Sequence, residues 1–370
     1  MPAYQQIELA ESFIKLLGPD QFRLAVLGSL SSSRKEMGWV DDNQQPYLLR
    51  FNDSAKDRSS TLSWINDADI VIHGRFPIKH VRARIKAGKL TYAYQERLWK
   101  KGFKWSRFVS RLPHLIKNYY SVDRANYHLL AAGRYAADDL QRLGLFKNRA
   151  WKFGYFIAPK QLPLKPALTP LRIIWTGRLI PLKRPMRALQ LAASLKQFGI
   201  AFHLELVGDG ELRSELELHA KSLGIADSVH FLGWQSVAVV NERMASAHIM
   251  LMSSDHREGW GVVINEAINN GCYPVVCDDV GSARWLIEDG VTGVVYQDRH
   301  FQEVCDKLAQ TFVSDPNAIA LQALQGHKRM TDQWSSDAAA ARLVSHARYL
   351  QSSTSSNPPF VLGPCSAVTD

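Results

Sequence analysis

The stretch from His248 to Gly293 limits what this chain can fold into more than any other stretch. Residues 248–254 form a short apolar run that ends in two serines, and a run that is apolar on both faces predicts a buried parallel strand. Residues 262–270 have helical spacing and stop at Gly271, a residue that suits a helix end. The chain therefore passes from a buried strand through a tight turn into a helix, as in a parallel α/β sheet.

The turn between strand and helix has residues suited to phosphates and hydroxyls. Gly259 and Gly261 let the backbone turn tightly near a ligand, and the free N–H groups that open the next helix attract anions. Carboxylates repel phosphate and accept hydrogen bonds from hydroxyls, so hydroxyl donors are the natural partners of Glu258 and Glu266. A sugar nucleotide has both groups, and we expect Glu258 to face its sugar and Glu266 its ribose. Without this context, two glutamates would more often be solvated charges.

A longer ordered string surrounds this turn. It consists of Glu258-Gly-x-Gly-x5-Glu266, Asn270-Gly-Cys-Tyr-Pro-Val-Val276, Val280-Gly281 and Glu288-Asp-Gly-Val-Thr-Gly293. The string resembles the nucleotide-sugar half of the family 4 glycosyltransferases, which are retaining enzymes of the GT-B fold. The resemblance implies an α/β protein in which two Rossmann-like domains, each with a doubly wound parallel sheet, face a cleft. It also implies a C-terminal helix that crosses back to the first domain.

Length and composition agree with two globular domains. The chain has 370 residues, of which 46% are hydrophobic, enough for two cores. A connector with four prolines, residues 158–170, marks the domain boundary. We therefore expect an N-terminal acceptor-side domain over 1–157 and a C-terminal nucleotide-sugar-binding domain over 171–335. A crossing helix over 336–351 and a disordered tail over 352–370, rich in serine, proline and small residues, complete the chain.

The first domain matches the resembled family less closely. Its predicted opening helix spans residues 3–17. Members of the resembled family begin instead with a strand and a glycine-rich loop. Either this edge of the domain is closed differently, or the sequence starts late. Predicted strands follow at 22–27, 47–51, 69–74, 89–94 and 127–132, with polar loops at 28–33 and 38–43. Glu96 follows the fourth of these strands, where relatives carry a histidine, and is our candidate for an acceptor-side base. The alternative is an ion pair with Arg97 or a neighbouring lysine.

In the second domain, two cations and several glycine turns complete the expected donor site. The strand 171–177 leads into Arg178-Leu-Ile-Pro-Leu-Lys183, and in the resembled family the arginine and lysine of this loop hold the diphosphate. A leaving nucleoside diphosphate gains negative charge that two cations stabilise without a metal, so we expect no metal cofactor. The other expected donor contacts are the glycines after the strands 202–207 and 229–232 and the residues of the central turn, namely Gly208, Gly233, Gly259, Trp260, Gly261 and Val262.

Motifs for zinc, disulfides and membrane insertion are missing from the sequence. The four cysteines show neither CxxC spacing nor a cluster with histidine, which argues against a zinc site and against a disulfide framework. No apolar run approaches the roughly 20 residues that span a bilayer, and residues 1–18 lack the pattern of a signal peptide. We therefore expect a cytoplasmic protein.

The net charge of +10 is concentrated in one segment. Between Arg75 and Lys117 there are thirteen lysines and arginines against one acid, Glu96, and aromatic residues are interleaved with them at positions 92, 94, 99, 103, 105 and 108. Positive charge combined with aromatic rings suits an anionic membrane surface, and the alternative is a solvated basic face. A nucleic-acid groove is disfavoured, because no nucleic-acid-binding motif accompanies the segment.

Together these observations predict a metal-independent glycosyltransferase, and the family resemblance implies that it is a retaining one. It would move a sugar from a nucleotide-diphosphate sugar to a hydroxyl of a glycan or lipid-linked acceptor, in surface polysaccharide synthesis on the inner face of the membrane. A sugar-nucleotide epimerase or phosphorylase of the same fold is disfavoured by the string from Glu258 to Glu266. The alternative from another class is a catalytically inactive GT-B-like binding protein, recruited to membrane or nucleic acid by its basic face. The donor's base and sugar, the acceptor and the linkage stay open.

Overall fold

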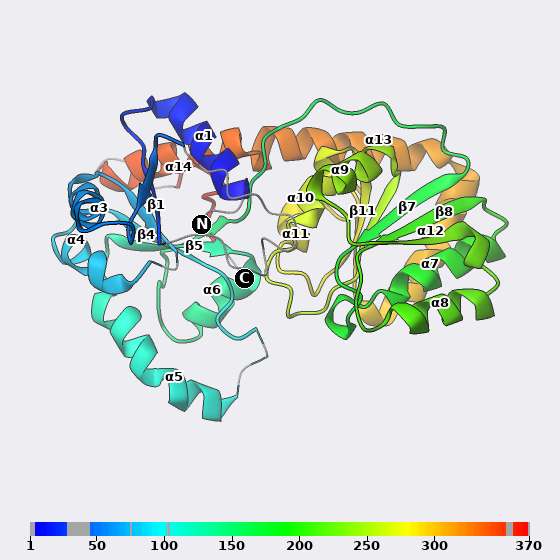
Figure 1. Cartoon of the computed structure of the whole chain (residues 1–370), viewed down its shortest axis with the longest axis horizontal. Coiled ribbons are helices and arrows are strands. Elements are labelled where there is room, and N and C mark those ends of the chain that lie inside the picture. The colour runs from blue at the N-terminus through cyan, green and yellow to red at the C-terminus, as the bar shows by residue number, and fades with distance from the viewer. Residues whose placement is uncertain are drawn as a thin grey trace. The chain divides into compact units, whose positions relative to one another are not determined.

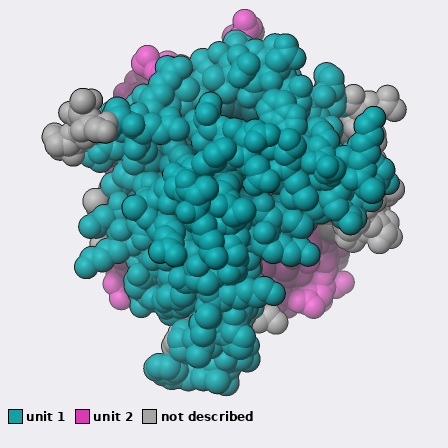
Figure 2. All heavy atoms as spheres, turned by 90° about the vertical axis from the view of Figure 1, so that its left-hand side faces the viewer, with its two compact units in different colours: residues 1–158, 333–370 teal, residues 159–332 magenta. Residues whose placement is uncertain are grey.

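The structure is a computed structural model of the chain, and it describes residues 4–27, 45–74, 76–100, 102, 104–352 and 358–368 (Figure 1). The chain folds into two compact units. Unit 1 contains residues 1–158 and 333–370, and unit 2 contains residues 159–332 (Figure 2). The polar loops predicted at 28–33 and 38–43 lie outside the described residues.

Unit 2 contains a parallel sheet of six strands. They are β7 Leu171–Thr176, β8 Phe202–Val207, β9 Val229–Gly233, β10 Ile249–Met252, β11 Tyr273–Cys277 and β12 Val294–Tyr296. The order across the sheet is β12-β11-β10-β7-β8-β9. The chain therefore winds outward from β7 in one direction and, starting again at β10, in the other. This is the doubly wound Rossmann order, and the predicted fold class is confirmed for this unit.

Helices cover both faces of this sheet. Figure 1 shows α7, α8 and α12 on one face and α9, α10 and α13 on the other. They are α7 Met186–Gln197, α8 Arg213–Ser222, α9 Val237–Ser246, α10 Val263–Asn269, α12 Phe301–Ser314 and α13 Pro316–Arg329. A 3-10 helix, η3 (Pro181–Lys183), and the short helix α11 (Ala283–Leu286) lie in the connections.

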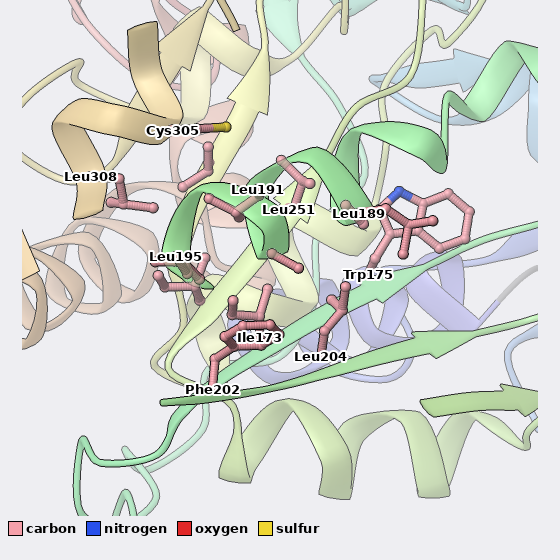
Figure 3. Packing of buried hydrophobic residues seen from close by; sticks show 14 of the residues in the cluster. Ile173, Trp175, Leu189, Leu191, Leu195, Phe202, Leu204, Leu251, Cys305 and Leu308 are labelled. Carbon is pink, nitrogen blue, oxygen red and sulfur yellow. The ribbon is translucent and has the colours of Figure 1, made fainter. Parts of the chain in front are cut away.

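The core of unit 2 fixes the strands that carry the central motif. Side chains of β7, β8 and β10 pack beneath α7 and α12 (Figure 3). The strands contribute Ile173, Trp175, Leu204 and Leu251, and the helices contribute Leu189, Leu195, Cys305 and Leu308. Full burial of a large apolar side chain contributes about 1.5–3 kcal/mol. The carboxyl ends of β7 and β10 are therefore anchored by a rigid core.

Unit 1 contains two parallel sheets. In the first, β1 (Leu24–Val26) pairs with β2 (Leu48–Arg50). The second has the order β3-β4-β5-β6, with β3 Val71–His73, β4 Thr91–Gln95, β5 Tyr127–Ala132 and β6 Ala150–Phe153. The helices are α1 Tyr4–Leu17, α3 Ala55–Asp67, α4 Arg82–Lys86, α5 Trp105–Asn118, α6 Arg134–Gln141 and α14 Ser336–Gln351. Strand β6 and helices α3 and α5 are missing from the sequence prediction.

Helix α14 belongs to unit 1 although it follows unit 2 in the chain, as expected of a crossing helix. It packs against α1, where the Ser12 hydroxyl donates a hydrogen bond to Asp337 over 2.7 Å. It also contacts the sheet: His346 Nδ1 lies 2.9 Å from the Tyr92 hydroxyl of β4, and the His346 ring lies 4.2 Å from that of Trp151 in β6. These contacts on two sides fix the helix to the first unit.

The prediction of a disordered tail over 352–370 is wrong for residues 358–368. This segment runs antiparallel to β6. The amide of Lys152 donates to the Ser366 carbonyl over 2.8 Å, the amide of Cys365 to the Lys152 carbonyl over 2.7 Å, and the amide of Val368 to the Ala150 carbonyl over 3.0 Å. Main-chain bonding of this kind depends little on side-chain type, which is why composition does not predict it.

Two further expectations concern cysteines and membrane insertion. Cys272, Cys277, Cys305 and Cys365 are all buried thiols without a disulfide partner. Of the helices in the described part of the chain, none is both long and apolar enough to cross a membrane.

Truncation after Ser352 tests the contribution of the C-terminal segment. It removes the main-chain hydrogen bonds to β6, each of which contributes about 1 kcal/mol, and it uncovers a strand edge. We expect the free energy of unfolding of unit 1 to fall by about 2–4 kcal/mol and the soluble yield to fall as well. Urea unfolding followed by circular dichroism measures this loss. An unchanged midpoint would show that residues 358–368 do not stabilise the unit.

Candidate functional site

The strand order of unit 2 reverses between β7 and β10, and ligands of open α/β sheets bind where the carboxyl ends of such strands separate. Gly177 and Arg178 follow β7, and η3 then carries Lys183. Residues 253–258 follow β10 and end in Glu258. The two expected diphosphate cations and the first glutamate of the central motif therefore lie at the same edge of one sheet.

Ser253 and Asp255 join the two loops at this edge. The Ser253 hydroxyl accepts a hydrogen bond from the Trp175 indole over 3.0 Å and lies 2.8 Å from the Lys183 carbonyl oxygen. The Asp255 amide donates to the Leu182 carbonyl over 2.9 Å. Because the backbone of η3 is fixed from β10, the side chain of Lys183 is directed by the fold. The sequence alone does not reveal this role for Ser253, since its partners lie about seventy residues away.

The glycine loop after β8 packs backbone against backbone on the loop after β7. A Cβ atom added at Gly208 would lie 1.9 Å from the Gly177 carbonyl oxygen, and one at Gly210 would lie 2.5 Å from that of Leu179. The Gly208 amide also donates to the Gly233 carbonyl over 2.8 Å. Gly208 and Gly233 thus have a packing role that is visible without a ligand, and their predicted contact with the donor stays a prediction.

The two arginines near η3 differ in their surroundings. Arg184 adopts φ of 47° and pairs with Asp279 at 2.9 Å and with Asp298 at 3.6 Å, so its charge is already compensated. Arg178 is exposed, and within the described residues its guanidinium has neither a hydrogen-bond partner nor an ionic partner. Arg178 is therefore the cation whose charge a bound anion would meet.

Lys183 and Glu258 form the central pair of the site. The Lys183 ammonium donates a short hydrogen bond to Glu258 Oε2, and both side chains are mostly buried. The backbone of Glu258 is also fixed, because its amide donates to the Asp255 carbonyl over 2.9 Å. The structure thus places a cation for phosphate and a carboxylate for hydroxyls in direct contact.

The indole of Trp260 does not face a ligand. Its side chain is only 2% exposed, and its Nε1 donates to Asn265 over 2.9 Å. The Ser282 hydroxyl donates to the Trp260 carbonyl. The prediction that Trp260 contacts the donor is therefore wrong for its side chain, which anchors the turn in the core. Ser282 is the N-cap residue of α11, but its hydroxyl bonds this turn and makes no capping hydrogen bond to the helix.

The remaining residues of the turn leave backbone groups and open space at the start of α10. Gly261 has φ of 80°, and a Cβ there would lie 3.0 Å from Met252 Cε, so glycine is required. At Gly259 an added Cβ would meet nothing within 4 Å, so this glycine borders open space. Val262 is the N-cap residue of α10. The predicted anion contact at Gly259 and Val262 is compatible with this geometry.

Glu266 is a buried carboxylate inside α10. Its residue is 9% exposed, and within the described residues no side chain or backbone amide donates a hydrogen bond to its carboxylate. Burial raises the pKa of Glu266 to about 7. A carboxylate in such a place is stabilised by a ligand that brings its own hydroxyl donors, as a ribose does.

Glu96, the expected acceptor-side base, lies in unit 1. Its Oε2 pairs with Lys100 at 2.5 Å, and its Oε1 accepts a short hydrogen bond from the Tyr155 hydroxyl. This is the ion pair with a neighbouring lysine that the sequence left open as the alternative. The role of Glu96 as a base stays a prediction.

The basic segment 75–117 does not form one solvated face. Arg84 is buried and donates to five oxygen atoms, among them the Ile65 carbonyl at 2.6 Å and the Leu90 carbonyl at 2.7 Å. Residues 75, 101 and 103 lie outside the described residues, as does the side chain of residue 107. The exposed cations divide into two groups: Lys79, Lys86 and Lys89 lie before β4 in the chain, and Lys100, Lys104, Arg111 and Lys117 lie on α5 and the loop before it.

Solved structures with this arrangement define its class. Anabaena HepE in complex with UDP matches 93% of this chain and 97% of its own, with 15% identity and a TM-score of 0.63. The lipopolysaccharide outer core galactosyltransferase WaaB in its apo form matches 82% of this chain and 84% of its own, with 17% identity and a TM-score of 0.57. The chain therefore has the GT-B fold, as predicted.

The family relationship comes from unit 2. Residues 162–322 match the family model described as glycosyl transferases group 1. A GDP-mannose-dependent alpha-(1-6)-phosphatidylinositol monomannoside mannosyltransferase of Mycobacterium tuberculosis is 28% identical over 182 residues, which are 48% of this chain and 47% of that protein. Unit 2 thus has the sequence pattern of this glycosyltransferase family, and the predicted resemblance is confirmed for this region. The chain spans about half the length of the mannosyltransferase that it matches.

Within the described residues, no group of three or more His, Cys, Asp or Glu side chains lies close enough together to hold a metal ion. The metal independence expected from the sequence stays a prediction.

Replacement of Glu266 with glutamine should change the pH dependence of stability. Below pH 4.5 the carboxyl is protonated in both the folded and the unfolded protein, so wild type and variant should be equally stable. Between pH 4.5 and about 7 the unfolded wild type releases this proton while the folded protein retains it, so wild type loses stability relative to the variant. Above pH 7 the difference is constant and at most about 3 kcal/mol.

Urea unfolding at pH 5 and pH 8 measures this difference. The variant Glu215→Gln, at an exposed position of α8, is the matched control and should follow wild type at both pH values. A Glu266→Gln variant that gains no stability at pH 8 would contradict the burial of an ionised carboxylate.

Proposed function

We propose that this protein is a metal-independent, retaining glycosyltransferase that moves a sugar from a nucleoside-diphosphate sugar to a hydroxyl of a glycan or lipid-linked acceptor. The observation that carries the proposal is the contact between Lys183 and Glu258 at the reversal point of the unit 2 sheet. In a nucleotide sugar the diphosphate joins two hydroxyl-bearing rings, the ribose and the transferred sugar, and the junction with the transferred sugar is the bond that is broken in transfer. A cation in contact with a carboxylate is complementary to that junction.

The charges around this pair agree with a diphosphate. Lys183 forms an ion pair with Glu258, whereas Arg178 is exposed and unpaired among the described residues. A diphosphate would bind Arg178 and draw Lys183 toward it, which frees Glu258 for a sugar hydroxyl. Glu266, with its raised pKa of about 7, would accept hydrogen bonds from the ribose.

In the proposed reaction, the acceptor hydroxyl oxygen forms a bond to the anomeric carbon of the donor while the bond from that carbon to the β-phosphate oxygen breaks. The hydroxyl proton passes to the leaving β-phosphate, and both changes occur on the same face of the sugar, which retains its configuration. Arg178 and Lys183 stabilise the diphosphate charge that develops. Because Glu96 is already paired with Lys100 and hydrogen-bonded to Tyr155, we propose that the β-phosphate, and not this carboxylate, accepts the hydroxyl proton.

The relatives support this class of reaction. The Mycobacterium tuberculosis protein is named for transfer of mannose from GDP-mannose to a phosphatidylinositol mannoside, and WaaB for galactose transfer to the lipopolysaccharide outer core. HepE was solved with UDP. We therefore propose a role in the synthesis of a surface polysaccharide or glycolipid on the cytoplasmic side of the membrane.

We propose that helix α5 contacts an anionic membrane surface. Trp105, Val109 and Ile116 are 72%, 62% and 51% exposed and lie four and seven residues apart, so they form one apolar stripe. Figure 1 shows α5 projecting from the body of unit 1. Lysines at positions 104 and 117 lie at its two ends. A solvated basic face would not expose such a stripe, whereas a lipid surface buries it and attracts the lysines.

Replacement of Arg178 with glutamine should weaken nucleotide binding. Loss of one charge-assisted hydrogen bond to phosphate costs about 1.5–3 kcal/mol, so we expect the Kd for the cognate nucleoside diphosphate to rise about tenfold or more. Calorimetry with UDP and GDP in the presence of EDTA measures this and names the base. Arg172→Gln is the matched control, because Arg172 is an exposed arginine near the amino end of β7, the strand that Arg178 follows.

The outcomes of this experiment separate the alternatives. Binding that is lost in Arg178→Gln and kept in Arg172→Gln, followed by sugar transfer or slow donor hydrolysis, supports the enzyme. Binding without turnover favours an inactive binding protein, and interconversion of the free sugar nucleotide favours an epimerase. Binding that disappears with EDTA would contradict metal independence.

Replacement of Trp105 with glutamine should weaken attachment to lipid. We expect wild type to sediment with vesicles that contain anionic phospholipid at low salt, and the bound fraction to fall several-fold for Trp105→Gln because α5 loses its largest apolar contact. Trp234→Gln is the control, since Trp234 is an exposed tryptophan of unit 2. Equal sedimentation of wild type and both variants would contradict the assignment of α5, and binding to duplex DNA or RNA in place of vesicles would favour the nucleic-acid alternative.

A further inference from the structure

We propose that the carboxyl edge of unit 1 binds an oxyanion group of a sugar, and that this group, a carboxylate or a phosphate, belongs to the sugar acceptor. The site consists of the side chains of Arg58, Lys79 and His80 around the rings of Phe51 and Phe76, and we call it the cation–aromatic cluster. The assignment to an acceptor rests on the function proposed above, whereas the binding of an oxyanion does not.

The cluster lies where the carboxyl ends of β2 and β3 come together. Phe51 directly follows β2, and Phe76 lies in the loop after β3. Although these two strands belong to different sheets, the centres of the two rings are only 5.0 Å apart. Ligands of open α/β sheets bind at the carboxyl ends of the strands. The cluster therefore occupies the edge of unit 1 at which a ligand is expected.

Two basic side chains from separate helices pack on these rings. His80 ends the 3-10 helix η1 (Ile78–His80), and its ring centre lies 4.9 Å from that of Phe51 and 5.3 Å from that of Phe76. Arg58 lies in the first turn of α3, and its guanidinium carbon is 5.6 Å from the centre of the Phe51 ring. Contact with a ring orients a guanidinium and leaves its N–H edge to form paired hydrogen bonds with a carboxylate or a phosphate.

The positive charge of the cluster has no acidic partner among the described residues. Arg58 and Lys79 are exposed, and within the described part of the chain neither side chain forms an ion pair or a hydrogen bond. The two acids nearest to Arg58 in sequence have other partners. Asp53 lies 3.9 Å from Arg50, and the Asp57 carboxylate accepts a hydrogen bond from the hydroxyl of the N-cap serine of α3. An incoming oxyanion would therefore not compete with an acid for these two cations.

The surroundings of His80 show that the electrostatic potential at the cluster is positive. Partial burial lowers the pKa of the His80 imidazole, and the charges of Lys79 and Arg58 lower it further. Two cations from different elements thus act on one ring and disfavour a third positive charge. An oxyanion bound between them would reverse this effect and favour the protonated ring.

A sugar with an acidic substituent fits both parts of the cluster. Its oxyanion would accept hydrogen bonds from the three basic side chains. The C–H face of its ring would pack against Phe76, whose side chain is only partly buried. The substituent is either the carboxylate of a uronic acid or a phosphate ester. A neutral sugar lacks the group that the basic side chains require.

Binding of acidic and neutral monosaccharides tests the cluster without any sugar transfer. The probes are methyl glucuronoside, glucose 6-phosphate and methyl glucoside, titrated into the full chain with isotope-labelled histidine rings and followed by NMR. The variant His80→Gln identifies the His80 signal, and we expect only the two acidic probes to shift it. Arg58→Gln should raise the Kd of the acidic probes about tenfold, through loss of a charge-assisted hydrogen bond. Arg58→Lys should recover part of the loss, since charge is kept but the paired hydrogen bonds are not.

The pH dependence of binding is a second readout. Because an oxyanion beside the ring raises the pKa of the His80 imidazole, binding is coupled to uptake of a proton. The Kd of methyl glucuronoside should therefore fall as the pH is lowered from about 8 to about 6, a range in which lysine, arginine and the carboxylate of the probe keep their charges. This dependence should be absent in His80→Gln. A wild-type Kd that is constant over this range would contradict the placement of the oxyanion beside His80.

Arg124→Gln is the matched control. Arg124 is exposed and lies before the amino end of β5, so this variant should bind the acidic probes as wild type does. Equal binding of the acidic and neutral probes, or an unchanged Kd in Arg58→Gln, would overturn the proposal. Tighter binding of glucose 6-phosphate assigns the site to a phosphate-substituted acceptor, and equal or tighter binding of methyl glucuronoside assigns it to an acceptor that contains a uronic acid.

The same titrations separate this proposal from the proposed function, because nucleoside diphosphate binding depends on Arg178 in unit 2. If methyl glucuronoside binds the cluster while no nucleotide binds wild type, the glycosyltransferase proposal fails and the oxyanion site remains. If nucleotide binds wild type and Arg58→Gln binds the acidic probes as tightly as wild type, the cation–aromatic cluster is the part that fails.

Discussion

The carboxyl edge of the unit 2 sheet depends on a steric constraint between two loops. The backbone at Gly208 lies so near the Gly177 carbonyl that no side chain fits, and the Gly210 backbone packs in the same way on Leu179. Arg178 lies between these two contacts, at Gly177 and Leu179, and its side chain is exposed. The close packing of the loops thus fixes the backbone on both sides of an exposed cation.

Electrostatics then distinguishes structural from available charges. Arg184 and Arg187 are neighbours of the site in sequence, but both pair with Asp298, and Arg184 also pairs with Asp279. These pairs fix the loop at the start of α7, and their charge is already compensated. Lys183 is intermediate, since its partner Glu258 belongs to the site itself. In the proposed function, a phosphate at this edge would therefore compete with Glu258 for Lys183 and would meet no competing acid at Arg178 among the described residues.

The sequence predicted the elements of unit 2 well because its strands are apolar on both faces and end at glycines, a pattern that depends on local residues. It failed where tertiary partners decide the outcome. The Trp260 indole is buried and donates to Asn265, Arg84 is buried because the carbonyl oxygens of residues 65, 68, 69 and 90 surround it, and residues 365–368 bond to the open edge of β6. Periodicity and composition contain no information about such partners.

The burial of Glu266 lowers the stability of the folded protein. Its carboxylate is buried in α10 without a donor among the described residues, which raises its pKa to about 7 and makes the ionised form unfavourable. A protein selected for stability alone would place an apolar residue or a glutamine there. In the proposed function, a ligand with two adjacent hydroxyls would supply these donors, and its binding would offset the cost of burying the carboxylate. Arg178 differs in this respect, because its side chain is exposed and its charge is solvated.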